Sequence, residues 1–134
     1  MIAPAWFADI LATYPRVAVS GGPSSGKTTL ASSVTDRPVL STDDFMALPW
    51  SDVPHAVMNQ AKGMGDRWVI EGVQVARALR KGLTPDVVVH LEGAHVTLTT
   101  GQDAMTKGVR TVFSEWVGMN AVSKRIPVVV RGRK

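Results

Sequence analysis

The hydrophobic positions of this chain form five short apolar runs, separated by longer segments of mixed polarity. Val87–Val89 and Val128–Val130 are unbroken valine runs, a pattern typical of strands buried on both faces of a parallel sheet. We therefore predict five strands: Arg16–Ser20, Pro38–Ser41, Trp68–Glu71, Asp86–Leu91 and Ile126–Val130.

The segments between these runs have helical spacing. The predicted helices are Lys27–Thr35, Val53–Lys62, Val73–Lys81 and Thr99–Met119, with a short amphipathic helix at Ala5–Leu11. Alternation of strands and helices predicts an α/β fold, a three-layer α/β/α sandwich around a mainly parallel five-stranded sheet. With 134 residues and no repeat or linker, we expect residues 1–134 to form one domain.

The composition narrows the class of protein. Hydrophobic residues make up 45% of the chain and charged residues 19%, which favours a folded globular protein. Cysteine is absent, which excludes disulfides and thiolate chemistry and fits a reducing compartment. No run reaches the roughly 18 apolar residues of a membrane helix, and Met1–Tyr14 lacks the basic start of a signal peptide. We expect a cytoplasmic protein without a membrane partner.

One motif predicts nucleotide binding. From Gly21 to Thr28 the chain matches the phosphate-loop pattern G-x-x-x-x-G-K-[ST], between a predicted strand and a predicted helix. In this pattern the backbone N–H groups of a Gly-rich turn and a helix N-terminus surround phosphate. Lys27 would reach the β- and γ-phosphates, and the Thr28 hydroxyl would ligate Mg²⁺. The alternative is a glycine-rich turn without a ligand. The expected nucleotide-binding residues are Gly22, Pro23, Ser24, Ser25, Gly26, Lys27, Thr28 and Thr29.

A second motif, Ser41-Thr42-Asp43-Asp44-Phe45, directly follows the second predicted strand. With the phosphate loop, it resembles the kinase branch of the P-loop NTPases, which includes nucleoside, nucleotide and polynucleotide kinases. The resemblance covers most of the chain in element order. It implies ATP and Mg²⁺ as cofactors and transfer of the γ-phosphoryl group to a hydroxyl. It also implies that Asp43 is the general base and that Asp44 positions Mg²⁺ or substrate; alternatively, the two acids only cap a helix.

The carboxyl ends of parallel strands open onto one crevice, so Asp43 and the phosphate loop should share a rim. Glu71, at the end of the third strand, should lie on the same rim and bind substrate or a metal-bound water. The alternative is a helix cap or an ion pair with Arg77 or Arg80. The fourth strand runs from Asp86 towards Glu92 without the Asp of a strong Walker B motif, which argues against a motor or helicase ATPase.

The resemblance also implies a lid with a cation that stabilises the moving phosphoryl group. The candidate segment is Gln102–Arg110, in which Lys107 and Arg110 are three residues apart and share a helix face. Arg110 is the first candidate for this catalytic role, Lys107 the second and Arg125 the third. Lys107 is also expected to contact the substrate. The alternative is a solvated helix face.

Phe45–Ala61 lies where this branch of kinases binds the acceptor. Trp50 follows a proline and can stack on a base; alternatively it packs on its own domain. The three histidines lack the spacing of a metal site, and we expect structural roles for them: His55, His90 and His95.

The net charge is +4 and the isoelectric point about 9.9. The basic tail consists of Lys124, Arg125, Arg131, Arg133 and Lys134. It can attract nucleic acid or simply be solvated. The short acceptor and lid regions favour a large substrate, so DNA is the expected partner.

Size and motif layout resemble the phage hydroxymethyluracil DNA kinase group, which would place the protein in the host cytoplasm. The expected acceptor is a hydroxymethylated pyrimidine in DNA or a polynucleotide 5′-hydroxyl. The alternatives are a small-molecule nucleoside or nucleotide kinase and a nucleotide-binding switch or ATPase.

Overall fold

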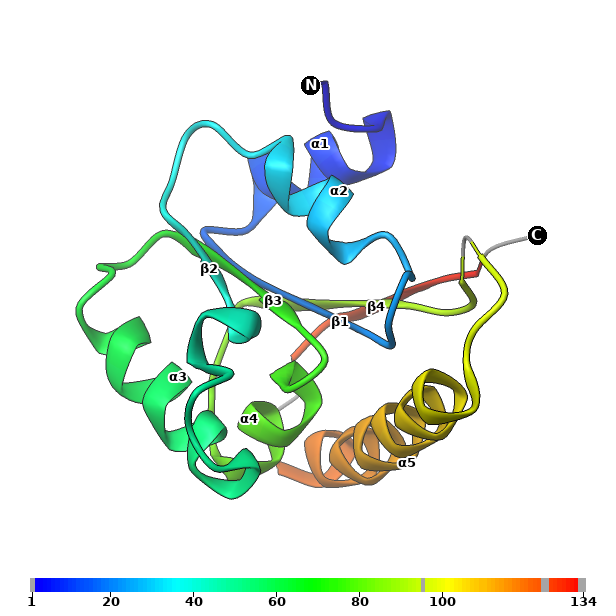
Figure 1. Ribbon diagram of the computed structural model, residues 1–134. Coiled ribbons are helices and arrows are strands. Elements are labelled where there is room, and N and C mark those ends of the chain that lie inside the picture. The colour runs from blue at the N-terminus through cyan, green and yellow to red at the C-terminus, as the bar shows by residue number, and fades with distance from the viewer. Residues whose placement is uncertain (1, 95, 124–125, 133–134) are drawn as a thin grey trace.

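A five-stranded, entirely parallel sheet forms the centre of the protein in a computed structural model that describes residues 2–94, 96–123 and 126–132 (Figure 1). The strands are β1 (Arg16–Gly21), β2 (Val39–Ser41), β3 (Trp68–Gly72), β4 (Val87–Leu91) and β5 (Val128–Arg131). The α-helices are α1 (Ala5–Thr13), α2 (Lys27–Ser32), α3 (Val53–Lys62), α4 (Val75–Lys81) and α5 (Thr100–Ser123). Two short 3₁₀ helices, η1 (Thr42–Phe45) and η2 (Trp50–Asp52), follow β2.

The sheet has the strand order β2-β3-β1-β4-β5. From β1 the chain crosses to one edge of the sheet to form β2 and returns to form β3 between β2 and β1. It then passes to the other side of β1 to form β4 and β5. The carboxyl end of β1 is therefore the point where the winding direction reverses, and open α/β sheets bind ligands in the crevice at such a point. The phosphate-loop motif begins at this end of β1.

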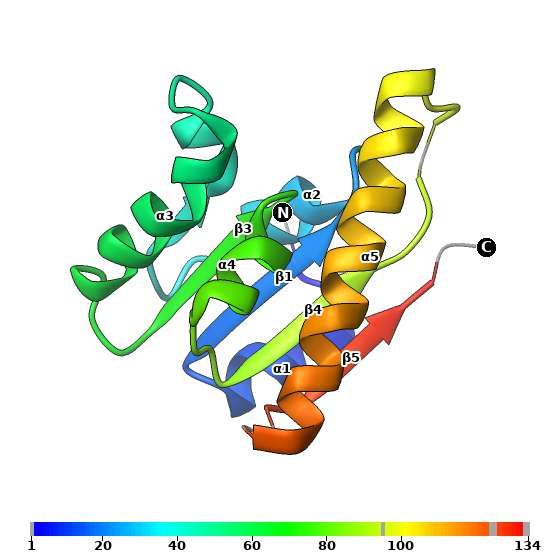
Figure 2. The ribbon, with the colours of Figure 1, turned by 90° about the horizontal axis from the view of Figure 1, so that it is seen from below.

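Helices cover both faces of the sheet, an arrangement compatible with the predicted three-layer sandwich. On one face, α1 and α2 pack over valines such as Val17 and Val19 of β1. On the other face, α3, α4 and α5 pack over Ala18 of β1 and Ile70 of β3 (Figure 2). Successive residues of a strand point to opposite faces, so β1 supplies both cores. The predicted α/β class and parallel sheet are confirmed.

The prediction that Val128–Val130 is buried on both faces is wrong. β4 is buried along its whole length, but β5 is only half-buried, and Val130 is 54% exposed. The physical reason is position: β5 lies at the edge of the sheet beside β4, where less of each face is covered. A valine run therefore marks a strand in both cases, but not its depth in the sheet.

Among the described residues, none of the helices has the length and apolarity needed to cross a membrane.

Candidate functional site

The phosphate-loop motif forms a tight turn between β1 and α2. Ser24 and Gly26 both have positive φ angles, 59° and 101°, so the backbone reverses sharply just before α2 begins at Lys27. A Cβ on Gly21 would lie 2.5 Å from the Ser25 hydroxyl oxygen and 3.0 Å from the Leu91 carbonyl oxygen. The glycine that opens the motif is therefore required by close packing against the turn and β4.

Lys27 is buried and its ammonium group lies inside the turn. Its Nζ donates a hydrogen bond to the Gly22 carbonyl oxygen at 2.6 Å and approaches the Ser25 hydroxyl at 3.4 Å. Burial lowers the pKa of Lys27, an effect opposed by the negative charges of Glu71 and Asp43. The side chain is thus held by the loop on one side and attracted by carboxylates on the other.

The other residues of the loop border open space. Lys27 and Thr28 line a cavity of about 320 Å³ together with Ser24, Gly26, Thr29 and Val96. Thr28 and Thr29 are exposed, so their hydroxyl groups are available to a ligand in this cavity. The structure therefore brings the predicted lysine and threonine to one cavity.

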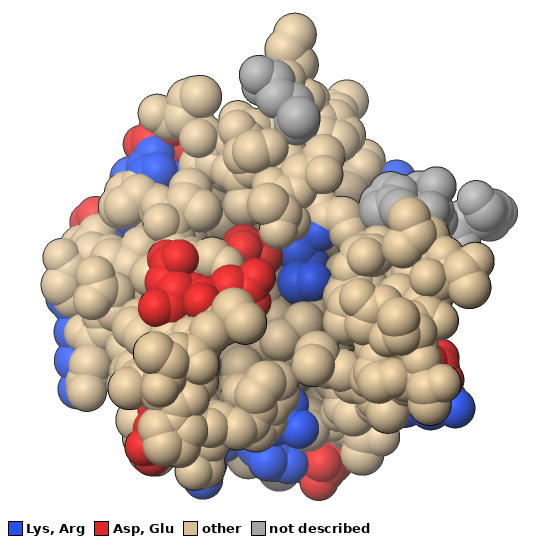
Figure 3. Space-filling view, in the orientation of Figure 1, with Lys and Arg blue, Asp and Glu red and all other residues tan. Residues whose placement is uncertain are grey.

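An acidic cluster, formed by Asp43, Asp44 and Glu71, lies at the carboxyl ends of β2 and β3. Glu71 pairs in register with Ser41, the residue that precedes η1 and its two aspartates. Figure 3 shows acidic side chains gathered beside a basic group near the middle of one face. Of this cluster, Glu71 and Asp43 interact electrostatically with Lys27, so these three side chains lie near one rim of the sheet.

The members of the cluster differ sharply in exposure. Glu71 is 3% exposed, and its carboxylate accepts a hydrogen bond from the Ser41 side chain. Burial raises the pKa of Glu71, and Asp43 and Asp44 raise it further, while the Ser41 hydrogen bond and Lys27 act in the opposite direction. Asp43 and Asp44 are exposed in η1. The cluster therefore has a buried carboxyl below an acidic rim.

The capping interpretation of the acidic residues holds only in part. Ser41, rather than either aspartate, caps η1: its side chain accepts a hydrogen bond from the Asp43 backbone N–H at 3.2 Å. The two arginines considered as ion-pair partners of Glu71 are engaged elsewhere. Arg80 pairs with Glu115 at 3.1 Å, and Arg77 lies over the Trp50 ring.

Trp50 borders a small pocket next to Asp43, which we call the rim pocket. The pocket has a volume of about 160 Å³ and is lined by Thr42, Asp43, Met46, Leu48, Trp50, Val53, Val73 and Gln74. Trp50 is 46% exposed, with the Arg77 guanidinium 5.1 Å from its ring centroid. The predicted base and the predicted stacking residue thus line one cavity. Sequence reasoning missed Gln74, because nothing in its local pattern distinguishes it from an ordinary polar residue at a helix start.

The segment Gln102–Arg110 is part of the long helix α5 and does not form a separate lid. Its Thr106 packs on the phosphate loop, where a Cβ on Gly22 would come within 2.6 Å of the threonine hydroxyl oxygen. Lys107 is exposed and pairs with Asp103 of its own helix at 3.2 Å, which fits the solvated-face alternative. Arg110 instead points towards the end of β4, with its Nε 3.9 Å from Glu92. Arg110 is therefore closer than Lys107 to the rim of the sheet.

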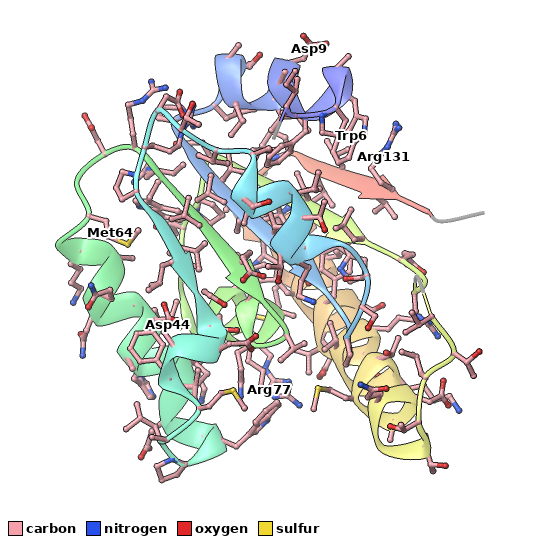
Figure 4. All side chains as sticks on the ribbon, turned by 45° about the horizontal axis from the view of Figure 1, so that its top comes forward. Trp6, Asp9, Asp44, Met64, Arg77 and Arg131 are labelled. Carbon is pink, nitrogen blue, oxygen red and sulfur yellow. The ribbon has the colours of Figure 1, made fainter. Side chains whose placement is uncertain are left out.

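A second cavity that the sequence did not predict adjoins the phosphate loop. It has a volume of about 260 Å³, and Ser25, Gly26 and Thr29 line it together with Trp6, Glu92 and Arg131. The Arg131 guanidinium lies 4.6 Å from the Trp6 ring centroid, joining α1 to the end of β5 (Figure 4). Arg131 was expected in a basic tail. The rest of that tail, Lys124, Arg125, Arg133 and Lys134, lies outside the described residues.

The remaining candidates have structural contacts. His90 is buried, stacks on Phe113 with ring centroids 3.9 Å apart, and its Nδ1 lies 3.0 Å from the Ser20 hydroxyl. Asp86 pairs with Arg16 at 3.0 Å, at the opposite end of β4 from the phosphate loop. His55 is exposed, and His95 lies outside the described residues.

In the part of the chain that the structure describes, no group of three or more His, Cys, Asp or Glu side chains has the arrangement of a metal site. No protein-family model matches the chain, and no curated protein is significantly similar to it.

Proposed function

We propose that the protein is an ATP-dependent P-loop kinase that transfers the γ-phosphoryl group to a hydroxyl group, most favourably on DNA. The observation that carries the proposal is the juxtaposition of a phosphate-loop lysine with carboxylates from two neighbouring strands. Phosphoryl transfer depends on positioning and charge stabilisation, and these two groups supply opposite charges for phosphate and for an acceptor hydroxyl.

The donor nucleotide would lie along the phosphate loop. The backbone of Gly22–Gly26 binds the phosphates, and Lys27 leaves the Gly22 carbonyl oxygen to contact the β- and γ-phosphates. The cavity lined by Trp6 and Arg131 continues from Gly26 and Thr29, so it can hold the base of the nucleotide. Trp6 offers an aromatic face for stacking, which is sequence-tolerant and typical of base binding.

The residues present fit a magnesium ion. Mg²⁺ prefers oxygen ligands, retains several waters and is usually bound through one or two carboxylates and the substrate phosphates. In this proposal the Thr28 hydroxyl would hold the ion directly, and Asp44 and Glu71 would hold it through water. When bound, the ion neutralises charge on the phosphates. Glu71 belongs to β3, the strand next to β1, so in this proposal β3 supplies the acid that is absent after β4.

Asp43 acts as the general base. It lines the rim pocket and is exposed, so an acceptor hydroxyl can reach its carboxylate. The hydroxyl oxygen attacks the γ-phosphorus and loses its proton to Asp43, while the bond between the γ-phosphorus and the bridging oxygen breaks and ADP leaves. Arg110 is the candidate cation for the charge that develops during transfer.

A transfer assay with γ-labelled ATP tests the proposal. The acceptors are hydroxymethyluracil DNA, unmodified DNA, 5′-hydroxyl DNA and RNA, free nucleosides and nucleoside monophosphates. We expect label in nucleic acid, with hydroxymethyluracil DNA favoured over unmodified DNA, and no label with Lys27→Ala. Label confined to a nucleoside or nucleotide would favour a small-molecule kinase. Release of inorganic phosphate without transfer to any acceptor would contradict the proposal and favour an ATPase or switch.

A further inference from the structure

The rim pocket contains an unused hydrogen-bond acceptor. Gln74 is 2% exposed, and its side-chain Nε2 donates to the Trp50 carbonyl oxygen at 3.3 Å. Its Oε1 is buried and has no hydrogen-bond partner among the described residues. A buried acceptor without a partner destabilises the fold, and native proteins rarely retain one without a reason. A donor supplied by a ligand would satisfy this atom.

The pocket has the size of one ring. Its volume is about 160 Å³, and an apolar protein cavity of roughly 150 Å³ is known to admit benzene. Its walls are mainly apolar, formed by Met46, Leu48, Trp50, Val53 and Val73. The volume therefore matches a single flat six-membered ring more closely than a bicyclic purine.

The apolar wall is unusually open. Met46 is 80% exposed, Leu48 41% and Trp50 46%, so three large hydrophobic side chains gather at the pocket without being buried. Such side chains gain free energy when a ligand covers them. Asp43 lies at the same pocket, so a substituent on a bound ring can face a carboxylate.

On these grounds, and resting on the proposed function, we propose that the rim pocket binds a single six-membered heterocyclic base, whose ring N–H donates a hydrogen bond to Gln74 Oε1. Gln74 is then a specificity-determining residue, and Asp43 faces a hydroxyl group carried by the ring. The ring can come from a free nucleoside or from a base turned out of a DNA strand.

Binding requires a local movement. Gln74 Oε1 is covered in the unliganded structure, and the Trp50 segment is held by the 3.3 Å hydrogen bond and by Arg77 over its ring. An incoming ring must displace this segment to reach the amide oxygen. The change should alter tryptophan fluorescence, and Trp50→Phe should remove the signal.

A titration without ATP tests the pocket separately from phosphoryl transfer. The probes are thymidine, N3-methylthymidine, in which a methyl group replaces the ring N–H donor, and deoxyadenosine as the bicyclic ring. We expect N3-methylthymidine to bind the wild type about tenfold more weakly than thymidine, as loss of one buried hydrogen bond predicts. Deoxyadenosine should bind more weakly still. A single-stranded oligonucleotide with one thymine among adenines, compared with free thymidine, distinguishes the two sources of the ring.

Gln74→Met is the matched variant, because it keeps the side-chain volume but removes both polar groups. We expect the variant to bind thymidine about tenfold more weakly than the wild type does. The variant should also bind thymidine and N3-methylthymidine with equal affinity. Its melting temperature should not fall much, since an unsatisfied acceptor has been removed. Equal binding of thymidine and N3-methylthymidine to the wild type, or no saturable binding of any probe, would overturn the inference. If thymidine binds as expected but no phosphoryl group is ever transferred, the pocket stands and the proposed kinase function fails.

Discussion

Two carboxylates at the ends of neighbouring strands have opposite surroundings: Glu71 is buried, and Asp43 is exposed. The sequence predicted that both would reach one rim, because parallel strands end on the same side. It did not predict their different exposure, which depends on the close packing of β3 against η1. Gly72 has a φ of 145°, and a Cβ there would overlap the Thr42 side chain. This contact is formed by residues distant in sequence, so no local pattern reveals it.

The role of Asp43 is tested by Asp43→Asn. We expect phosphoryl transfer to fall by about 10²–10⁴-fold, the usual contribution of a general base, with ATP affinity nearly unchanged. Asp44→Asn is the comparison, since Asp44 shares the same turn but does not line the rim pocket. A smaller loss is expected there. Unchanged turnover in Asp43→Asn would show that another group takes the proton.

Glu71 should make stability depend on pH. Because burial raises its pKa above the ordinary value of 4.5, the folded chain holds this proton more tightly than the unfolded chain. The contribution is fully present below about pH 4.5 and is lost as the pH rises through the folded-state pKa. The free energy of unfolding of wild type relative to Glu71→Gln should therefore fall as the pH rises above about 4.5. Denaturant unfolding of both proteins across this range measures it.

Glu115→Gln, at an exposed position paired with Arg80, serves as the control for the loss of one carboxylate. A wild-type advantage over Glu71→Gln that grew with pH would contradict the inferred environment of Glu71.

The elements themselves followed closely from the sequence. The helix Val53–Lys62 was predicted with the observed bounds, and each predicted strand lies within two residues of an observed one. The order of the strands in the sheet could not be predicted from the local sequence pattern. The order that places β1 between β3 and β4 depends on packing of the helices over two faces, as does the edge position that leaves β5 half-buried.

Helix α5 differs most from its prediction. The resemblance implied a lid, but the same residues continue one helix whose Thr106 packs directly on Gly22. The phosphate loop and α5 therefore contact each other directly at Gly22 and Thr106. The sequence contained no signal of it, because Gly22 could be explained by the phosphate-loop pattern alone.

Two alanine substitutions test this contact. In Gly22→Ala, the new Cβ would lie 2.6 Å from the Thr106 hydroxyl oxygen and 3.1 Å from its Cα. We expect a loss of about 1–3 kcal/mol in stability from overpacking, together with weaker nucleotide binding. Gly108→Ala in the same helix has no atom within 4 Å of the new Cβ and should stabilise the protein by about 0.4–1 kcal/mol. Equal unfolding midpoints for the two variants would show that Thr106 does not restrain the loop.

At the scale of the whole molecule, the two ends of the described chain meet beside the phosphate loop. Trp6 comes from α1 and Arg131 from the end of β5, and together they wall the cavity of about 260 Å³. Neither residue belongs to a motif, so the sequence offered no candidate for binding the donor base. Their role depends on the path of the whole chain around the sheet.

Trp6→Ala tests whether this cavity holds the base. We expect ATP to bind the variant about tenfold more weakly, since stacking of a base on an aromatic ring contributes about 1–3 kcal/mol. Inorganic tripolyphosphate, which has no base, should bind both proteins equally. Competition titrations with the two ligands measure the difference. An equal loss for ATP and tripolyphosphate would mean that Trp6 supports the loop without contacting a base.

The central claim is that the γ-phosphoryl group passes from ATP to a hydroxyl on DNA with Asp43 as the base. The most direct measurement follows γ-labelled phosphate in a reaction with hydroxymethyluracil DNA, using wild type and Asp43→Asn in parallel. We predict stable label on the DNA with wild type and at least about a hundredfold less with the variant. Label released as inorganic phosphate at the same rate with both proteins, with none on DNA, would contradict the claim.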